Sequence, residues 1–333
     1  MGLSSPPGPK RHDTLLDVVA GVSVRIRSLT RRAATRLFGR RPRKRTQAWS
    51  IGIYAGPSPF ELRTPPGMRN PVLTSADVSD VPAEFVADPF MLRVADVWHM
   101  FFEVKNARSK KGEIALATSR DARHWRYEGI VLAEPFHLSY PYAFEWKGQV
   151  YMVPETGKAG AVRLYRAEPF PRSWVFAGTL VQGEDLVDAS LFHARGRWWM
   201  LVQASPMPRH DTLRLYSAPD LDGPWGEHPA SPVVQSDPRV ARPAGRVLVH
   251  GDRILRFGQD CAEHYGTAVR AFEIVTLSPE TYEERPVGTD PMLSGSGHGW
   301  NADGMHHVDV HSTDDGRWLA CVDGLVRRPA PWP

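Results

Sequence analysis

Short apolar runs separated by tight polar turns cover almost the whole chain after residue 48. Apolar and polar residues alternate within these runs, and such alternation between short turns indicates antiparallel strands. One element, a strand followed by a tight turn and a second, aromatic-rich strand, recurs along the sequence. Its copies begin at Pro89, Tyr142, Ser190, Arg246 and Met305.

A second motif follows these strand pairs, and it gives the repeat its length. Three turns that end in Trp cover residues 119–125, 167–174 and 217–225, and a fourth copy ending in Tyr covers residues 278–282. The three Trp are 49 and 51 residues apart. About four strands per fifty residues, repeated five times, are typical of propeller blades. We therefore expect an all-β, five-bladed β-propeller in which each Trp caps its own blade and the strand Trp49–Ile53 joins the last blade to close the ring.

The N-terminal segment has a different pattern. Apolar residues from Leu15 to Leu37 recur at steps of three and four, which places them on one face of a helix. Thr14 and Asp17 have the spacing of a capping box, and Gly39 stands where a helix would stop. The sequence thus predicts a basic helix and linker over residues 1–47, followed by the propeller over residues 48–333.

Charge separates these two parts. Residues 1–45 hold 12 Lys and Arg against two Asp, so they carry +10, and the rest of the chain carries −6. Nucleic-acid binding by the acidic body is not expected, because the basic surface it needs is missing there. A basic amphipathic helix over residues 14–45 suits an anionic membrane surface. The alternative is a disordered or partner-docked leader whose charge keeps it solvated.

Neither a membrane span nor a secretory signal is expected. The chain has no run of 18 apolar residues. Asp17 and Gly21 interrupt its first apolar stretch, and the positive charge follows that stretch instead of preceding it. We expect a cytoplasmic protein, peripheral at the inner face of the membrane if the basic helix binds there. Cys261 and Cys321 are too few for a disulfide framework, and two free buried thiols are favoured over one bridge.

Polar residues precede the first strand of each predicted blade. In propellers these positions surround the mouth of the central channel, where a purely structural position would be apolar. They are Asp88, Ser139 with Tyr140, Asp188, Arg242 with Arg246, and finally Asn301, Asp303, His306, His307 and Asp309. Asp before Pro also serves ordinary turns, but two Asp in register with the repeat favour a functional site.

The chain resembles glycoside hydrolase family 43 in Asp88-Pro-Phe, in the Asp188-Ala-Ser-Leu-Phe run and in its Trp turns. It is similar in more detail, over about residues 48–325, to the N-terminal propeller domain of plant glucosamine inositolphosphorylceramide transferases and their bacterial relatives. The matching runs begin at Trp49, Ala87, Ser139, Met152, Arg242, Arg256, Tyr265 and His306.

The family 43 resemblance implies a pair of acid/base carboxylates. Asp88 matches the position of the general base and Asp188 that of a carboxylate that orients and tunes. Where that family has its acid Glu, at the start of the fourth blade, this chain has Arg242, which cannot give up a proton near neutral pH. Glu155 is then the best candidate for the acid, with Asp260 as the other.

The remaining candidates would bind substrate. A guanidinium binds phosphate or carboxylate through two parallel hydrogen bonds, so Arg242 and Arg246 favour an anionic sugar or a lipid-linked phosphate. An ion pair between Arg242 and Asp188 is the structural alternative. His306 and His307 invite a metal site, but neighbours on a strand face opposite ways, so one histidine that bonds a sugar or a channel Asp is favoured and no metal or other cofactor is expected. Tyr140 and Asp260 complete the candidate set.

These observations predict a carbohydrate-active enzyme that cleaves or transfers a glycosyl unit on a surface polysaccharide or glycolipid. The alternative is a non-catalytic glycan-binding or scaffold propeller that assists a separate glycosyltransferase, which the missing acid of the fourth blade favours. A weaker third possibility is an assembly protein held at the membrane by the basic helix.

Overall fold

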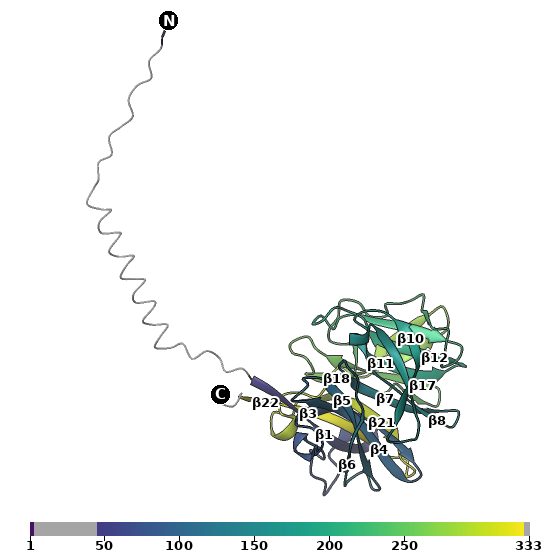
Figure 1. Cartoon of the computed structure of the whole chain (residues 1–333). Helices are drawn as coiled ribbons and strands as arrows, with labels where there is room; N and C mark the ends of the chain where they lie inside the picture. Colours follow the sequence, from purple (N-terminus) through teal and green to yellow (C-terminus); the bar gives the residue numbers. More distant parts are fainter. Residues whose placement is uncertain (3–44, 330–333) are drawn as a thin grey trace, which may run out of the picture. The chain divides into compact units, whose positions relative to one another are not determined.

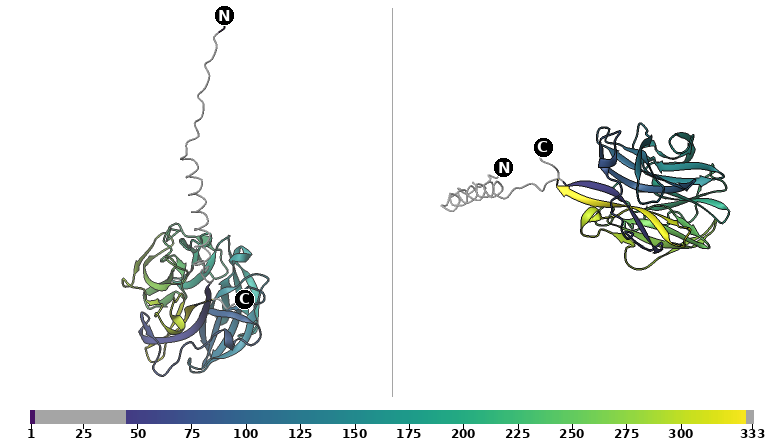
Figure 2. Two further views of the ribbon diagram at one scale, coloured as in Figure 1. Left: turned by 90° about the vertical axis from the view of Figure 1, so that its left-hand side faces the viewer. Right: turned by 90° about the horizontal axis from the view of Figure 1, so that it is seen from below.

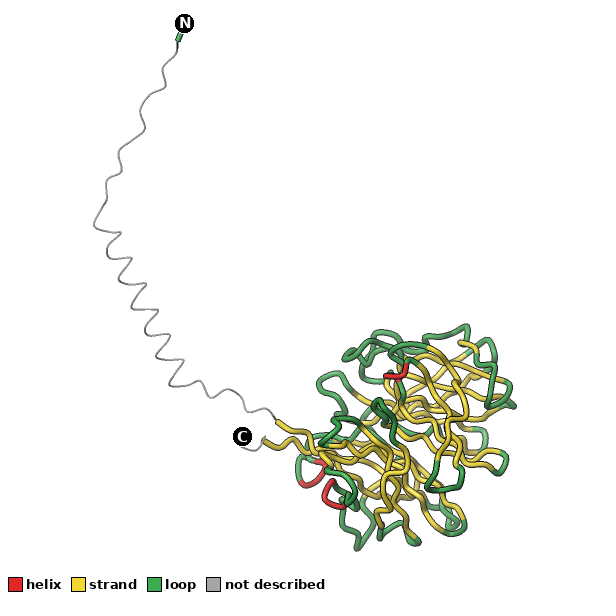
Figure 3. The backbone as a smooth tube through the Cα atoms, in the orientation of Figure 1, coloured by secondary structure: helices red, strands yellow, loops and turns green. Residues whose placement is uncertain are grey.

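Strands make up nearly all the regular structure of the described residues (Figure 3). The computed structural model describes residues 1–2 and 45–329, and the expected N-terminal helix lies outside these residues. Three 3₁₀ turns complete the described part, namely η1 (Ser75–Asp77), η2 (Gly157–Ala159) and η3 (Gly299–Asn301). Within residues 1–2 and 45–329, no helix has the length and apolar character that a bilayer span requires.

The described residues form five antiparallel sheets, which are the blades of a propeller (Figure 1). Blade 1 contains β3 (Ala83–Val94), β4 (Val97–Asn106), β5 (Gly112–Ser119) and β6 (Arg126–Leu132). Blade 2 contains β7 (Ser139–Trp146), β8 (Gln149–Glu155), β9 (Ala161–Ala167) and β10 (Trp174–Gln182). Blade 3 contains β11 (Val187–Ala194), β12 (Arg197–Gln203), β13 (Leu213–Ala218) and β14 (Gly226–Glu227). Blade 4 contains β15 (Arg242–Pro243), β16 (Leu248–His250), β17 (Arg253–Asp260), β18 (Ala268–Leu277), β19 (Tyr282–Pro286) and β20 (Leu293–Ser294).

Blade 5 joins the two ends of the described chain. Its strand order is β2 (Glu61–Arg63), β1 (Arg45–Ser58), β22 (Trp318–Pro329) and β21 (Val308–Ser312). Strand β1 lies beside β22 in Figure 1 and in the right-hand view of Figure 2. The prediction that the strand around Trp49–Ile53 closes the ring is therefore confirmed, and so is the five-bladed propeller.

The hydrophobic core lies between the blades. Five clusters of buried apolar side chains each combine residues of successive blades, and one of them, which includes Ile51, Met91 and Cys321, joins blade 5 to blade 1. This arrangement follows from the alternation of the strands, because both faces of a blade are covered by its neighbours. The cyclic series of interfaces holds the first strands of all blades around one centre.

The Trp turns are structural, as predicted. The indole Nε1–H groups of Trp125, Trp174 and Trp225 each donate to a backbone carbonyl of their own turn, at 3.2, 3.2 and 3.0 Å. Their rings pack against the blade core. Cys261 and Cys321 are both free thiols, with Cys321 buried and Cys261 half-buried.

Candidate active site

A β-bulge turns one side chain of each of the first three blades out of the regular strand pattern. The strand register shifts around Asp88, Tyr140 and Asp188. All three residues have a left-handed backbone, with φ of 53°, 46° and 56°. Such a φ is costly for residues other than glycine and persists where the surrounding structure enforces it, often at functional sites. The repeat thus aims three side chains at the same level of the channel.

A ring of polar side chains on the second strand of each blade surrounds this level. Their positions correspond, because pairing sets Glu103 opposite Ala87, Glu155 opposite Ser139, Gln203 opposite Val187 and Gln259 opposite Arg242. Asp323 occupies this position in blade 5. All five side chains are buried. Four of them were not predicted from the sequence, although Glu103, Gln203 and Asp323 each directly follow the apolar run of a second strand.

The polar groups enclose a cavity of about 290 Å³. This volume is near the lower end of the range for ligand pockets, roughly 300–1,000 Å³. Its lining includes Phe85, Asp88, Glu103, Lys105, His137, Glu155, Lys158, Met207, Arg242 and Tyr265. Asp185 is a further lining residue, so the cavity combines four carboxyl groups, three cationic side chains and an apolar rim.

Asp88 presents a buried carboxylate oxygen to this site. Its Oδ2 accepts the backbone N–H of Tyr140 at 3.3 Å, whereas Oδ1 has no hydrogen-bond partner within residues 45–329. Burial raises the pKa of Asp88 to about 7, against the opposing charge of His306. A buried carboxyl with a free oxygen and this pKa is suited to take or give a proton near neutral pH.

Glu155 and Glu103 face the cavity from neighbouring blades. Glu155 accepts the backbone N–H of Gly157 at 2.7 Å, and burial raises its pKa to about 7. Burial also raises the pKa of Glu103 well above its usual range. His137 lies between them, with Nε2 at 3.7 Å from Glu103 Oε1 and 4.0 Å from Glu155 Oε2.

His137 is neutral in this position. Its Nδ1 accepts a hydrogen bond from the backbone N–H of Gly112 at 2.7 Å, so the ring proton is on Nε2. Burial lowers the pKa of His137 to about 4. Its contacts with Glu103 and Glu155 are therefore polar contacts of an N–H rather than ion pairs.

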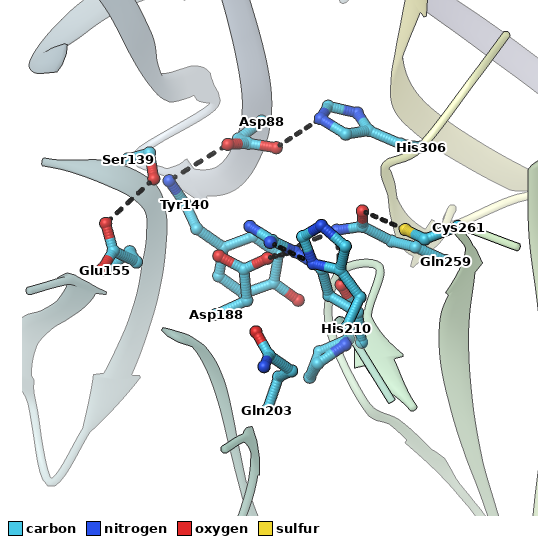
Figure 4. A network of polar contacts seen from close by, with 12 residues as sticks. Asp88, Ser139, Tyr140, Glu155, Asp188, Gln203, His210, Gln259, Cys261 and His306 are labelled. Atoms are coloured by element: carbon cyan, nitrogen blue, oxygen red, sulfur yellow. Dashed lines mark hydrogen bonds and ion pairs between the residues drawn. The ribbon is translucent and has the colours of Figure 1, made fainter. Parts of the chain in front are cut away.

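Asp188 and Arg242 form a buried ion pair. Arg242 Nε donates to Asp188 Oδ2 at 2.6 Å, and Nη1 donates to His210 Nδ1 at 3.0 Å. The guanidinium also lies 5.0 Å from the centre of the Tyr265 ring. Figure 4 shows Asp88, Glu155 and Asp188 around one space, with His210 beside Asp188. The alternative prediction for Arg242, an ion pair with Asp188, is thus confirmed, and Arg242 also lines the cavity.

Other predicted residues make contacts with the protein itself. Arg246 is paired with buried Asp309, with Nε at 2.7 Å from Oδ1. Asp260 accepts a hydrogen bond from Arg270 Nε at 3.1 Å. The Tyr140 hydroxyl bonds Ser190 at 2.8 Å and the backbone of Gly245. None of these three predicted residues belongs to the lining formed by the described residues, and their roles in binding stay predictions.

His306 and His307 have different surroundings, as expected for neighbours in a strand-like segment. His307 Nε2–H donates to the backbone carbonyl of Pro89 at 2.8 Å. His306 Nδ1–H donates to Asp323 at 2.8 Å. Asp88, His306 and Asp323 offer ligand atoms within 4.8 Å of one another, and a metal ion would need these three. Asp323, however, already accepts three backbone N–H groups, from Asp88, His306 and His307, so this donor set fits a hydrogen-bonded unit better than a metal site.

Comparison with known proteins assigns the chain to a family. The model of the family described as glucosamine inositolphosphorylceramide transferase 1, N-terminal, matches residues 43–325. The chain belongs to this family. The resemblance inferred from the sequence motifs is thereby confirmed.

Two members of the glucosamine inositolphosphorylceramide transferase family show the extent of the similarity. Glucosamine inositolphosphorylceramide transferase 1 of rice (Oryza sativa subsp. japonica) is 36% identical over 300 residues, and that of Arabidopsis thaliana is 34% identical over 297 residues. Each alignment covers 83% of this chain. The chain spans only 40% and 39% of the length of these relatives.

Solved structures of low sequence identity share the fold. A β-1,2-mannobiose phosphorylase from Listeria innocua has a TM-score of 0.59 at 14% identity, covering 82% of this chain and 96% of its own. A thermostable family-43 glycoside hydrolase has a TM-score of 0.55 at 14% identity, covering 80% and 98%. These similarities confirm the propeller of the glycoside hydrolase 43-like kind.

Proposed function

We propose that this propeller is a carbohydrate-active domain that cleaves or transfers a glycosyl unit of a glycolipid or surface polysaccharide in the cavity around Asp88. The observation that carries the proposal is the free Oδ1 of Asp88, buried at the cavity with the pKa raised to about 7. Asp88 Oδ1 acts as the general base. It takes a proton from a water molecule or an acceptor hydroxyl while the oxygen of that water or hydroxyl attacks the sugar carbon.

Glu155 is the proposed general acid. It lines the same cavity, and its raised pKa of about 7 leaves a substantial fraction protonated at neutral pH. Its proton goes to the leaving oxygen as the bond to the sugar carbon breaks. The base gains one proton and the acid loses one, so the pair is reset by exchange with solvent after product leaves.

Asp188 is proposed to orient rather than to react. Its Oδ2 is held by Arg242 at 2.6 Å and by Gln259 at 3.3 Å. The negative charge of Asp188 raises the pKa of Glu155, and the positive charge of Arg242 offsets part of this effect. The net result favours a protonated Glu155.

The cations of the cavity favour an anionic substrate. Lys105 and Lys158 line it, and neither forms an ion pair with any residue that the structure describes. Together with Arg242 they suit a phosphate or carboxylate beside the sugar. The relatives are named for glucosamine and for inositolphosphorylceramide, a ceramide lipid that carries a phosphoryl group. A phosphate-containing glycolipid is therefore the first substrate to test.

A non-catalytic glycan-binding domain is the second candidate. Blade 4 places Arg242 where the family 43 pattern expects a carboxylic acid, and this Arg is held in an ion pair. The named transferases are about two and a half times as long as the aligned part of this chain. In this alternative, the cavity would recognise a sugar for a separate glycosyltransferase.

One experiment separates the two candidates. The purified chain, Asp88→Asn and Glu155→Gln are incubated with inositolphosphorylceramide and nucleotide-activated glucosamine, and with the glucosaminylated lipid alone. Products are measured by mass spectrometry and lipid binding by calorimetry. The exposed Asp220→Asn, whose partner is exposed Lys147, serves as the matched control.

The enzyme proposal expects turnover by the chain and by Asp220→Asn, and a loss of about 10²-fold or more in Asp88→Asn and Glu155→Gln. Affinity for the lipid should change much less. Binding that is unchanged in all variants, with no turnover by any, would favour the glycan-binding domain. Absence of both binding and turnover for a wide panel of phospholipid-linked and neutral glycans would contradict both.

The basic segment is proposed to meet an anionic membrane surface, with the chain peripheral at the cytoplasmic face. The support is the charge of +10 over residues 1–45. Co-sedimentation of the full chain with phosphatidylserine vesicles should exceed that with phosphatidylcholine vesicles, and Arg31→Glu with Arg32→Glu should weaken it. Equal binding to both kinds of vesicle would contradict the proposal.

A further inference from the structure

His306 lies between two carboxylates but outside the substrate cavity. Its Nδ1–H donates to Asp323 at 2.8 Å, and its Nε2 points to Asp88 Oδ1 at 3.6 Å. The side chain is 2% exposed, and it does not belong to the cavity lining formed by the described residues. Figure 4 shows the His306 ring directed at the Asp88 carboxylate, on the side away from Glu155. His306 therefore contacts the proposed base rather than the substrate.

Two aromatic side chains, Trp49 and Tyr265, hold the ring of His306. Trp49 of the ring-closing strand β1 stacks on it, with ring centres 3.9 Å apart and planes 19° from parallel. Tyr265 meets it edge-on at 5.1 Å. Gly266 leaves the space for this stack, because a Cβ there would lie 2.8 Å from Trp49 and 3.0 Å from the Cβ of His306.

We propose that His306 is a positioning residue that keeps Asp88 partly ionised near neutral pH, as an imidazolium ion whose two N–H groups face Asp323 and Asp88. The role of His306 in catalysis rests on the proposed function. The charge of the His306 ring does not depend on it. Asp323 fixes the proton on Nδ1, and the second proton of the imidazolium, on Nε2, is directed at the free oxygen of Asp88.

The charges around Asp88 explain why a cation is needed there. Burial of Asp88 disfavours its ionised form, and so do the charges of Asp188 and Asp323. The groups that face Asp88 from the elements packed against it are His306, His307, Asp323, Asp188, Arg242, Glu103 and Tyr265. His307 directs an unprotonated Nδ1 towards Asp88. The two cations that favour an ionised Asp88 are each paired with another carboxylate, Arg242 with Asp188 and His306 with Asp323, and the charge of His306 has the larger effect.

The protonation of His306 agrees with this role. Burial lowers the pKa of His306, but the charge and hydrogen bond of Asp323, together with the charge of Asp88, raise the pKa above its usual value. Burial raises the pKa of Asp323, but the charge and hydrogen bond of His306, the charge of His307 and the backbone N–H of Asp88 together lower it. Both shifts have the direction that an imidazolium–carboxylate pair produces.

Nuclear magnetic resonance of the unmodified chain gives the first test. The ring nitrogens of His306, assigned by comparison with His306→Gln, should show an imidazolium at pH 7. If the resonances show a neutral His306 at pH 6.5, the proposal is overturned. This test needs no activity assay of a variant. Asp323→Asn should lower the pKa of His306, and an unchanged pKa in that variant would also overturn it.

The second test follows the carboxyl carbon of Asp88, assigned by comparison with Asp88→Asn. In His306→Gln the pKa of Asp88 should rise by about one unit or more, because an opposite charge at this distance is lost. His311→Gln is the matched control, since His311 forms a His–Asp pair with Asp309 in the same blade. An unchanged Asp88 in His306→Gln, or an equal shift in both variants, would overturn the proposal.

Turnover gives a third, separate measurement. If the proposed function holds, the acidic limb of the kcat/KM profile moves to higher pH in His306→Gln by the same amount as the pKa of Asp88. A limb that stays in place although Asp88→Asn abolishes turnover would overturn the role of His306 and leave the proposed function intact. If no substrate is turned over, the two resonance tests still decide the charge state of His306.

Discussion

Replacing Arg246 by Met tests whether this residue supports the fold or the substrate. Arg246 is buried with Asp309, and its Nη2 also donates to the carbonyls of Ala143 at 2.9 Å and Met91 at 3.3 Å. The variant would remove the guanidinium from the fully buried Asp309 carboxylate and leave His311 as its partner. Removing one partner of a buried ion pair costs about 3–5 kcal/mol, so we expect a loss of that size in the free energy of unfolding at pH 7.

The pH dependence of the loss has a definite sign. Burial raises the pKa of Asp309, but Arg246 and His311 together hold this pKa below the usual range, so Asp309 stabilises the intact protein above its unfolded pKa. In Arg246→Met the pKa of Asp309 should instead rise above its unfolded value of roughly 3.9. The free energy of unfolding of the variant should therefore fall relative to the intact chain as the pH rises from about 4 to 7.

Urea unfolding followed by tryptophan fluorescence measures these changes. Arg285→Met is the control, because exposed Arg285 pairs with Glu273 at the surface and should cost less than about 1 kcal/mol. The double variant Arg246→Met with Asp309→Leu should recover part of the loss, because it removes the uncompensated charge. A loss below about 1 kcal/mol in Arg246→Met, together with a marked loss of glycan affinity, would refute the structural role and favour the role in binding substrate.

Three further predictions concern the channel. Since the pKa of Glu155 is raised from 4.5 to about 7, the free energy of unfolding should fall as the pH rises through this interval; Glu155→Gln should make that slope shallower in urea titrations, and an unchanged slope would contradict the assignment. Tyr140→Phe should cost about 1–3 kcal/mol in the same assay, since the backbone N–H of Gly245 loses its acceptor; a neutral effect would contradict this account. Gly245→Ala should prevent folding as judged by circular dichroism, because its Cβ would lie 1.8 Å from the Val308 carbonyl oxygen, whereas Gly226→Ala, with no atom within 4 Å, should fold normally.

The architecture was predictable from the sequence because it repeats. The Trp turns fix the length of the repeat, and alternation fixes the strands, so the five blades and the closure by the strand around Trp49 followed from pattern alone. The contacts of Arg246 did not follow, because sequence shows that a guanidinium lies near the channel but not which carboxylate reaches it. Asp309, its partner, is 63 residues away.

The candidate site was predictable only where it coincides with the repeat. Asp88 and Asp188 stood out because they occupy the same place in two blades. Glu103 belongs to an equally regular set on the second strands, but the residue type changes along the set from Glu to Gln to Asp, which hides the correspondence. His137, Lys105 and Lys158 lie in connecting segments or at strand ends, where no periodicity marks them, and only the packing of blades 1 and 2 brings them to one cavity.

The closure of blade 5 has a consequence for biosynthesis. Strand β1 leaves the ribosome early, but its partner β22 begins about 260 residues later, which takes roughly 13–52 s at 5–20 residues per second. During this time β1 exposes an unpaired edge that invites pairing with other chains. Because Trp49 also stacks on His306, the surroundings of the proposed base are completed only when the last strand has been made.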